Sequence, residues 1–348
     1  MGGIMRRIYP FVALLITFTT ACMAEDDCRF NSQRWDSILS DVRTRATEKN
    51  ISEETINATL RNPAFIPSIV KSDKNQSEFK LSLDDYLKRT VNQTRIVHGR
   101  QMHRKYPTML TRVENIYGVP PHVMLAFWGM ESNYGEVKAR HRLVDAFFTL
   151  MYDGRREKFF GDQLLALMKI ADDNALDIND IRGSWAGAMG HFQFIPTTLA
   201  SYGVDGNGDS HIDIINSVGD AMASAGNYLG KLGWNKGERI VRRVILPGNF
   251  DTTILDGKTK KTLTEWAQMG ILNPDGSPIP MGNMVAGLVA DVANLPTANA
   301  DDYNPDTDVA PQPVITAYLT YPNFYRIKKW NNSNWYAIAI AELADRLK

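Results

Sequence analysis

Apolar side chains recur at helical spacing over most of the chain, and this periodicity constrains the fold more than any other feature. In the segment RWDSILSDVRTRATEKN, apolar residues stand at offsets of 0, 3, 4 and 7 counted from Trp35, which places them on one helix face. Ser52 followed by two glutamates predicts another helix start, and a long helical stretch is expected over about 82–105. Between 108 and 240, helical patterns alternate with glycine-rich turns. The chain is therefore expected to be mainly α.

Strand-like sequence is confined to the C-terminal third. The β-branched run 239–246 ends at a Pro-Gly pair, and 314–320 is a second strand candidate. The intervening 273–312 is rich in Pro, Gly, Asn and Asp, which predicts loops. Residues 335–348 predict a C-terminal helix. These patterns predict a small β insertion in a helical protein.

The N-terminal segment MGGIMRRIYPFVALLITFTTACMA is typical of a secretory signal peptide. Arg6 and Arg7 precede a mostly apolar run of 13 residues, and small residues follow it. The run is shorter than the roughly 20 apolar residues of a membrane-spanning helix. Residues 1–24 are therefore expected to direct export and to be removed.

Two cleavage sites are compatible with this segment. The sequence TTAC, which ends at Cys22, resembles a lipobox, in which the cysteine is acylated and anchors the mature protein to a membrane. Alternatively, cleavage follows Ala24, and the mature protein carries no lipid. Either cut removes Arg6 and Arg7 and no acidic residue, so a slight acidic surplus remains.

The charge balance and the cysteine count exclude several classes of protein. Lys and Arg total 39 and Asp and Glu total 39, so the chain lacks the basic surplus of a general nucleic-acid binder. Two cysteines are too few for a disulfide framework or a cysteine-rich zinc module. None of the six histidines forms an HExxH motif, so a zincin-type metalloprotease is not expected.

A candidate catalytic acid lies in the segment PPHVMLAFWGMESNYG. Two prolines suit a helix start and Gly135 suits its end. Glu131 shares a helix face with three large apolar residues, which are Met124, Phe127 and Trp128. Apolar surroundings raise the pKa of a carboxyl group, as a general acid for glycosidic cleavage requires. The alternative is a glutamate that pairs with a local arginine or faces solvent.

A second segment, GSWAGAMGHFQFIPTT, combines small residues with polar and aromatic ones. Its glycines allow close approach of a ligand or of another helix. Ser184 and Gln193 offer neutral hydrogen bonds, and Trp185, Phe192 and Phe194 offer flat faces for sugar rings. The alternative is a tightly packed turn with ordinary core aromatics.

Together with the closing sequence YPNFYRIKKWNNSNWYAIAIAELADRL, these two segments resemble the lytic murein transglycosylases of the B type, over roughly 30–348. The resemblance implies a mainly α fold with a lysozyme-like catalytic domain, additional helices and a small β insertion. It also implies cleavage of the β-1,4 bond between N-acetylmuramic acid and N-acetylglucosamine in peptidoglycan, leaving a 1,6-anhydromuramyl end. The implied location is the periplasm, with or without attachment to the outer membrane as a lipoprotein.

The resemblance also assigns roles to residues. Glu131 is implied as the catalytic acid and then base, without a catalytic cofactor. Ser184, Gln193, Tyr228 and Asn331 fall on positions that line the glycan site. The expected partners are glycan strands, with no nucleic acid, and the protein is expected to be a monomer.

The chain is expected to divide into regions. After the signal peptide come an N-terminal helical region (25–110), a lysozyme-like catalytic core with an EF-hand-like loop (111–240), a small β and loop region (241–325) and a C-terminal helix packed on the α domain (326–348).

A single carboxylate suffices for this chemistry, because the substrate's own acetamido group assists the reaction. Asp145 and Asp153 lie near Glu131 in the sequence, without a supporting motif, and are expected to be surface or capping residues.

The segment DGNGDSHID resembles the start of an EF-hand calcium loop, with side-chain oxygens at positions 1, 3, 5 and 9. Ser210 replaces the glycine of position 6, and Asn216 replaces the glutamate of position 12. The resemblance implies a later aspartate as ligand. The expected set is Asp205, Asn207, Asp209, Asp220 and the carbonyl of His211, with Asp213 acting through water; the alternative is a turn without an ion. The ion would be structural.

Relatives often pair a cysteine near the mature N-terminus with one in the segment matching YDGRR. Gly154 stands at that second position, so Cys28 has no expected intrachain partner unless Cys22 survives processing. Three other functions remain as alternatives. They are a hydrolytic muramidase on the same scaffold, a non-catalytic peptidoglycan-binding scaffold protein, and a calcium sensor, which one loop without its final acid makes weak.

Overall fold

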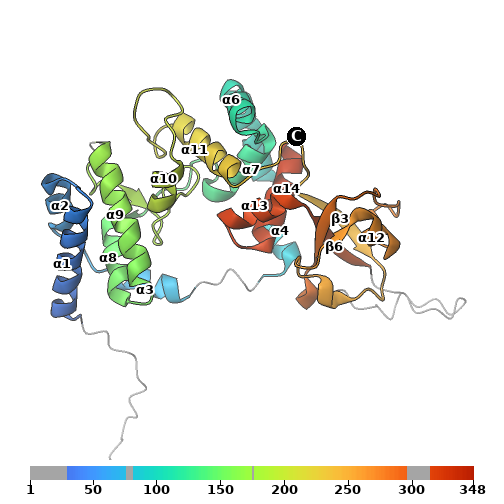
Figure 1. Cartoon of the computed structure of the whole chain (residues 1–348), viewed down its shortest axis with the longest axis horizontal. Coiled ribbons are helices and arrows are strands. Elements are labelled where there is room, and N and C mark those ends of the chain that lie inside the picture. The colour runs from blue at the N-terminus through green and yellow to red at the C-terminus, as the bar shows by residue number, and fades with distance from the viewer. Residues whose placement is uncertain (1–29, 76–80, 175, 296–313) are drawn as a thin grey trace, which may run out of the picture.

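The computed structural model describes residues 30–75, 81–174, 176–295 and 314–348, and helices dominate them (Figure 1). The helices are α1 (Ser32–Glu48), α2 (Glu53–Leu60), α3 (Pro67–Lys74), α4 (Leu83–Thr90), α5 (Gln93–Lys105), α6 (Pro107–Tyr117), α7 (Pro121–Ser132), α8 (Leu143–Asp153), α9 (Glu157–Asp173), α10 (Pro196–Tyr202), α11 (Val218–Lys231), α12 (Leu263–Gln268), α13 (Pro322–Trp330) and α14 (Asn334–Leu347). The strands are β1 (His141–Arg142), β2 (Arg182–Gly183), β3 (Val241–Leu246), β4 (Lys261–Thr262), β5 (Val285–Val289) and β6 (Ile315–Thr320). The predicted fold class, mainly α with a small β insertion, is confirmed.

The elements form a row across the molecule. Figure 1 shows α1, α2, α8 and α9 at one end and the sheet with α12 at the other. Between them lie α7, α13 and α14. The four-stranded sheet is antiparallel, with strand order β3-β6-β5-β4, and β1 pairs separately with β2. The last two helices therefore return the chain from the sheet to the middle of the helical part.

The helical periodicity of the sequence is mostly confirmed. The face of α1 that carries Trp35, Ile38 and Val42 is buried, and the Ser52 hydroxyl caps α2 by accepting from the amide of Thr55. The prediction of one helix over 82–105 is wrong, because the first helix ends at Thr90 and a second begins at Gln93. The side chain of Asn92 starts α5 as a new N-cap, and this local hydrogen bond competes with helix continuation.

Both predicted strands are confirmed, and they are neighbours. β3 and β6 pair from Val241 opposite Thr320 to Leu246 opposite Ile315. The prediction of loops throughout 273–312 is wrong at β5, which pairs with β6 and buries four of its five residues. The surrounding Pro and Gly residues hid this short apolar strand. Residues 296–313 lie outside the described part.

The catalytic helix candidate, α7, runs through the middle of the main core. It packs against α5, α6, α11 and α14, and every residue from Val123 to Gly129 is buried. Burial on all sides requires apolar residues all round the helix, which its sequence supplies. A second apolar cluster, centred on the fully buried Trp266, lies between the sheet and α12. α7 is therefore the buried central helix of the main core, and four other helices pack around it.

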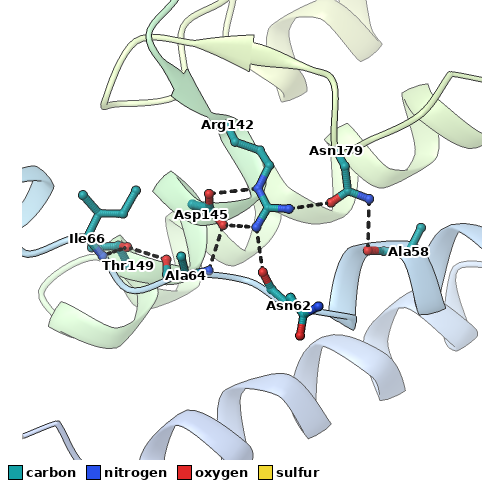
Figure 2. Close-up of polar contacts among 8 residues, drawn as sticks. All are labelled: Ala58, Asn62, Ala64, Ile66, Arg142, Asp145, Thr149 and Asn179. Carbon is teal, nitrogen blue, oxygen red and sulfur yellow. Dashed lines mark hydrogen bonds and ion pairs between the residues drawn. The ribbon is translucent and has the colours of Figure 1, made fainter.

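An ion pair fixes the N-terminal helices to α8. Asp145 is 8% exposed and pairs with Arg142, and its carboxylate also accepts from the amide of Ala64 at 2.8 Å (Figure 2). Arg142 donates onward to the carbonyl of Asn62 and the side chain of Asn179. The prediction that Asp145 is a surface or capping residue is wrong. Its carboxylate holds the linker between α2 and α3, where an unpaired charge would be costly.

The start of α1 docks beside the end of α8 without a covalent link among the described residues. Gly154 ends α8 with a φ of 83°, a conformation that favours glycine. Next to it, the ring of Tyr152 stacks on Phe30 at 5.4 Å, and its hydroxyl accepts from the amide of Asn31. Asp153 pairs with Arg155 at 2.8 Å. Aromatic and polar contacts hold the place where relatives are expected to carry a disulfide.

The predicted signal peptide, 1–24, and both cysteines, Cys22 and Cys28, lie outside the described residues. Within the described ranges, none of the helices combines the length and the apolar character needed to cross a bilayer.

Candidate active site

Glu131 occupies the last turn of α7. The helix begins with Pro121 in its first turn and ends at Ser132, three residues before the predicted stop at Gly135. It ends there because Asn133 and Tyr134 have φ angles of 50° and 62°, in the left-handed region. Two consecutive residues in this region turn the chain sharply, so Glu131 lies at the rim of the core.

Two aromatic side chains from the end of the chain hydrogen-bond Glu131. The indole Nε1 of Trp330, the last residue of α13, donates to Glu131 Oε1 at 3.0 Å, and the hydroxyl of Tyr336, in α14, donates to the same oxygen. Burial and the adjacent Glu131 carboxylate raise the pKa of Tyr336 well above its ordinary value. Tyr336 therefore stays protonated and acts as a hydrogen-bond donor at neutral pH.

An aromatic cluster surrounds the inner side of Glu131. The ring of Trp330 lies 4.9 Å from Phe127, 5.4 Å from Phe194 and 5.0 Å from Tyr228, measured between centroids. Tyr228 in turn stacks on Tyr202 at 4.4 Å. Such ring pairs restrict one another, so the indole that contacts Glu131 is held in place.

A cleft of about 850 Å³ opens in front of Glu131. Three of the predicted site residues line it together: Glu131, Gln193 and Asn331. Glu131 is the one acidic residue among those that line it. The remaining residues that line it are Leu81, Tyr86, Arg89, Thr90, Arg95, Met130, Ala188, Trp330 and Tyr336. This size is within the range of ligand-binding clefts.

Two predicted site residues lie behind the cleft surface. The hydroxyl of Ser184 accepts from the amides of Ala186 and Ala188, and it thereby shapes the turn that presents Ala188 to the cleft. Tyr228 contacts Trp330 from behind, and its hydroxyl donates to the carbonyl of Lys329 at 3.4 Å. In the structure these two residues support the cleft and do not line it.

Gln193 is held in a strained turn. Its φ is 50°, and its side-chain amide donates to the carbonyl of Gly190 at 2.9 Å. The neighbouring residues Met189 and Phe194 bridge the turn through backbone hydrogen bonds. A non-glycine residue in this region costs free energy, and such strain is found at binding sites more often than elsewhere.

The EF-hand-like loop is folded by its own hydrogen bonds. Asp205 accepts from the amides of Gly208 and Ser210, and these bonds lower the pKa of its carboxyl group. Asp220 is fully buried and accepts from the amides of Gly206, Asn207 and Asp213.

The amide of Asn207 donates to Asp209 at 2.8 Å, and Asp209 also accepts from the backbone N–H of His211. Among the residues that the structure describes, no three His, Cys, Asp or Glu side chains are grouped as a metal site. The predicted ligands are neighbours in the loop, and their side-chain oxygens are the type that calcium prefers. In this structure these oxygens accept from amides of the loop, most of them backbone amides.

Sequence reasoning did not identify Trp330, Tyr336 and Arg95. Trp330 and Tyr336 lie in the closing sequence on which the resemblance partly rests, but the resemblance assigns a site role there only to Asn331. Their aromatic side chains, close to Asn331 in the sequence, were the signal that could have indicated them as site residues. Arg95 belongs to an arginine- and histidine-rich helix that reads as a solvated face, and nothing in the local pattern distinguishes it.

A second cleft, of about 880 Å³, lies between α4, α14 and the sheet. Its charged residues include Asp84, Arg243, Glu342 and Arg346. It shares no residue with the Glu131 cleft, and α4 separates the two by presenting different residues to each.

The chain is similar in sequence to a known lytic transglycosylase. The chain is 31% identical over 259 residues to the membrane-bound lytic murein transglycosylase B of Escherichia coli strain K12, an alignment that covers 74% of this chain and 65% of that protein. The chain therefore spans slightly less than two thirds of that relative.

Solved structures agree on the fold. SltB3 from Pseudomonas aeruginosa, in complex with NAG-NAM-pentapeptide, superposes with a TM-score of 0.79 at 33% identity, over 90% of this chain and 79% of that one. The Escherichia coli lytic transglycosylase Slt35 in complex with calcium superposes with a TM-score of 0.72 at 26% identity, over 90% and 92%.

The family model described as the transglycosylase SLT domain matches residues 34–345, which include Glu131, the cleft and both helices that supply its hydrogen-bond donors. The chain belongs to this transglycosylase family.

Proposed function

We propose that this protein is a peptidoglycan lytic transglycosylase, in which Glu131 acts first as acid and then as base. It cleaves the β-1,4 bond between N-acetylmuramic acid and N-acetylglucosamine and leaves a 1,6-anhydromuramyl end. The observation that carries the proposal is the single carboxyl group of the cleft, which is held by Trp330 and Tyr336. The family membership and the relatives named above support the substrate class.

In the first step, Glu131 protonates the oxygen of the leaving sugar. Oε1 already accepts two hydrogen bonds, so the transferable proton belongs on Oε2. A positive charge develops on the muramic acid ring, and the substrate's acetamido group stabilises it. The two donors on Oε1 stabilise the carboxylate that this step leaves behind.

In the second step, the ionised Glu131 removes the proton from the C6 hydroxyl of the same muramic acid. The C6 oxygen attacks C1 and closes the anhydro ring, which regenerates the protonated Glu131. This hydroxyl competes with water because it is attached to the reacting sugar and has a high effective concentration. Gln193 and Asn331 bind the strand so that the bond to be cleaved faces Glu131.

Mass spectrometry of the fragments released from purified peptidoglycan tests this proposal. The mature protein should release anhydro-ended fragments, and Glu131→Gln should release none above background. Anhydro-ended fragments from both proteins in equal amounts would contradict the role of Glu131. Reducing ends from the wild type would support the hydrolytic muramidase, and strand binding without any release would support the non-catalytic scaffold.

We further propose that the loop binds a structural calcium ion through Asp205, Asn207, Asp209, Asp220 and the carbonyl of His211. All of these ligands are oxygens, which calcium prefers, and Slt35 has been solved with calcium. Calcium would neutralise the acidic side chains of the loop, and it takes no part in the bond cleavage.

We also propose a cellular location and an oligomeric state for the protein, from its sequence. The protein is exported by residues 1–24 and acts in the periplasm as a monomer, either anchored to the outer membrane through Cys22 or released by cleavage after Ala24. Metabolic labelling with a fatty acid separates the two forms, because only acylation of Cys22 incorporates the label. We also propose that the mature chain consists of four regions, with boundaries after residues 110, 240 and 325.

A further inference from the structure

Arg95 is an arginine that the surrounding structure fixes inside the Glu131 cleft. It stands in the first turn of α5, where its backbone N–H donates to the Asn92 side chain at 2.9 Å. Its carbonyl accepts from the hydroxyl of Tyr134 at 2.9 Å. Tyr134 follows the catalytic helix directly, so the backbone of Arg95 is tied to the same turn that positions Glu131.

The guanidinium of Arg95 has no anionic partner among the described residues. Nη1 donates to the carbonyl of Thr90 and lies 3.9 Å from the sulfur of Met130, the residue before Glu131. Nε is buried and has no hydrogen-bond partner. None of the ion pairs found within the described ranges involves Arg95, and burial lowers the pKa of this side chain.

A half-buried cation without a counter-charge is unfavourable for folding. Elsewhere in the described part, a partly buried arginine, Arg142, is paired with Asp145. Arg95 instead lines a cleft of about 850 Å³. An arginine fork matches a carboxylate in shape and in charge, so the expected occupant is a carboxylate supplied by the ligand.

We propose that Arg95 binds a carboxylate on the substituent that muramic acid carries at O3, and that it thereby selects peptidoglycan over chitin. This inference rests on the proposed function. The O3 substituent is a lactyl group, which ends in a carboxylate on a denuded strand and continues into a carboxylate-bearing stem peptide on an intact strand. Chitin, built only of N-acetylglucosamine, has no such group. Arg95 is thus a specificity-determining residue next to the catalytic acid.

Binding measurements in the Glu131→Gln background test this role, because they do not depend on turnover. Three ligands are compared: peptidoglycan oligosaccharides with stem peptides, the same strands after removal of the peptides, and chitin oligosaccharides of equal length. Arg95→Gln should weaken binding of at least one muramic acid ligand by about ten- to a hundredfold, the range for a hydrogen bond to a charged group. Its affinity for chitin oligosaccharides should stay unchanged.

Two further variants make the result specific. Arg104→Gln removes the same charge from an exposed position of α5, outside the cleft, and should leave all three affinities unchanged. Arg95→Lys keeps the charge without the fork and should restore part of the affinity. Thermal unfolding of each variant shows whether the fold is retained.

The outcomes separate the possible sources. Weakened binding of the peptide-bearing ligand alone assigns the stem peptide, and weakened binding of the denuded strand assigns the lactyl carboxylate. Equal weakening for chitin and for both muramic acid ligands would overturn the inference, as would no weakening at all. If wild-type protein released no anhydro ends, the proposed function would fail, whereas these binding differences would still decide the role of Arg95.

Discussion

At the scale of single residues, Glu131 is held by two hydrogen-bond donors. Trp330 and Tyr336 both donate to Oε1, and the neighbours of Trp330 prevent its ring from moving away. Their hydrogen bonds strengthen when Glu131 becomes ionised, because a hydrogen bond to a charged acceptor is stronger than one to a neutral group. They therefore favour the first step of the proposed mechanism, in which the proton leaves Glu131.

Tyr336→Phe tests this stabilisation. The substitution keeps the ring and removes one donor, so the rate of release of anhydro-ended fragments should fall by about ten- to a hundredfold. Tyr228→Phe is a matched control, because its hydroxyl donates only to a carbonyl at 3.4 Å and its ring contacts are kept. A Tyr336→Phe enzyme as fast as the Tyr228→Phe enzyme would contradict the stabilising role.

His191 makes the segment behind the cleft sensitive to acid. Nδ1 of His191 accepts from the indole N–H of Trp128 at 3.1 Å, and burial lowers the pKa of His191. A histidine whose pKa is lower in the folded than in the unfolded state is protonated first in the unfolded chain. Its contribution is therefore fully present above the unfolded pKa of about 6.5 and is lost as the pH falls towards the folded value.

The corresponding measurement is the free energy of unfolding by urea between pH 7.5 and pH 5. We expect stability to fall with pH less steeply in His191→Gln than in the wild type, since glutamine does not titrate. His103→Gln removes an exposed histidine and should keep the wild-type slope. Identical slopes for wild type and His191→Gln would show that His191 is not the group responsible.

The sequence could predict Glu131 as a candidate catalytic acid because its environment is local. Its apolar neighbours lie within two turns of one helix, so their spacing reveals the burial. Trp330 and Tyr336 are 199 and 205 residues away from it. No periodicity links residues at such separations, and only the tertiary fold brings these donors to the carboxylate.

At the scale of elements, α5 and α7 approach closely because glycines face Tyr134 on both. A Cβ at Gly129 of α7 would lie 2.7 Å from Cζ of the Tyr134 ring, and a Cβ at Gly99 of α5 would also collide with this residue. The ring of Tyr134 thus fills the space between the two helices. This contact couples the backbone of Arg95 to the end of the catalytic helix.

Gly129→Ala should destabilise the protein by about 1–3 kcal/mol, since overfilling a packed core forces helices apart. Gly230→Ala in α11 is the matched control. A Cβ there would meet its nearest neighbour at 3.6 Å, so the better helix propensity of alanine should leave stability unchanged or slightly higher. Chemical denaturation measures both. Equal free energies of unfolding for the two variants would refute tight packing at Gly129.

The errors of sequence analysis at this scale have a common cause. The prediction of one helical stretch over 82–105 joins α4 and α5, whereas Asn92 caps α5 as a separate helix. Another missed β5 because its neighbours are loop-forming residues. In both cases, one or two residues that form local hydrogen bonds or turns outweigh the average character of the segment.

At the scale of the whole molecule, the proposed calcium ion would stabilise the folded chain. An ion that binds only the folded state, present at a hundred times its dissociation constant, adds about 2.7 kcal/mol to the free energy of unfolding. For a protein of this size, that corresponds to a rise of roughly 5 °C in melting temperature.

Calorimetry with calcium and with a chelator measures this rise. The Asp205→Asn variant should lose it, and so should the wild type when magnesium replaces calcium at the same concentration, because magnesium demands a stricter octahedral geometry. A melting temperature that calcium leaves unchanged would exclude a calcium site of useful affinity in this loop.

The overall architecture was the most predictable level. Amphipathic helices and two β-branched strands specify a mainly α protein with a small sheet, and the order of these elements was readable along the chain. The sequence predicted a C-terminal helix packed on the α domain, but it did not predict which helix is its neighbour; in the structure α14 packs on α7.

The long sequence separation between Glu131 and its donors also means that the site is incomplete until nearly the whole chain has been made. A ribosome adds about 5–20 residues per second, so Trp330 and Tyr336 are made roughly 10–40 s after Glu131. Until then the acid has neither its indole nor its phenol, and one side of the cleft is missing. A chain that ends before α13 therefore contains Glu131 without either of its hydrogen-bond donors.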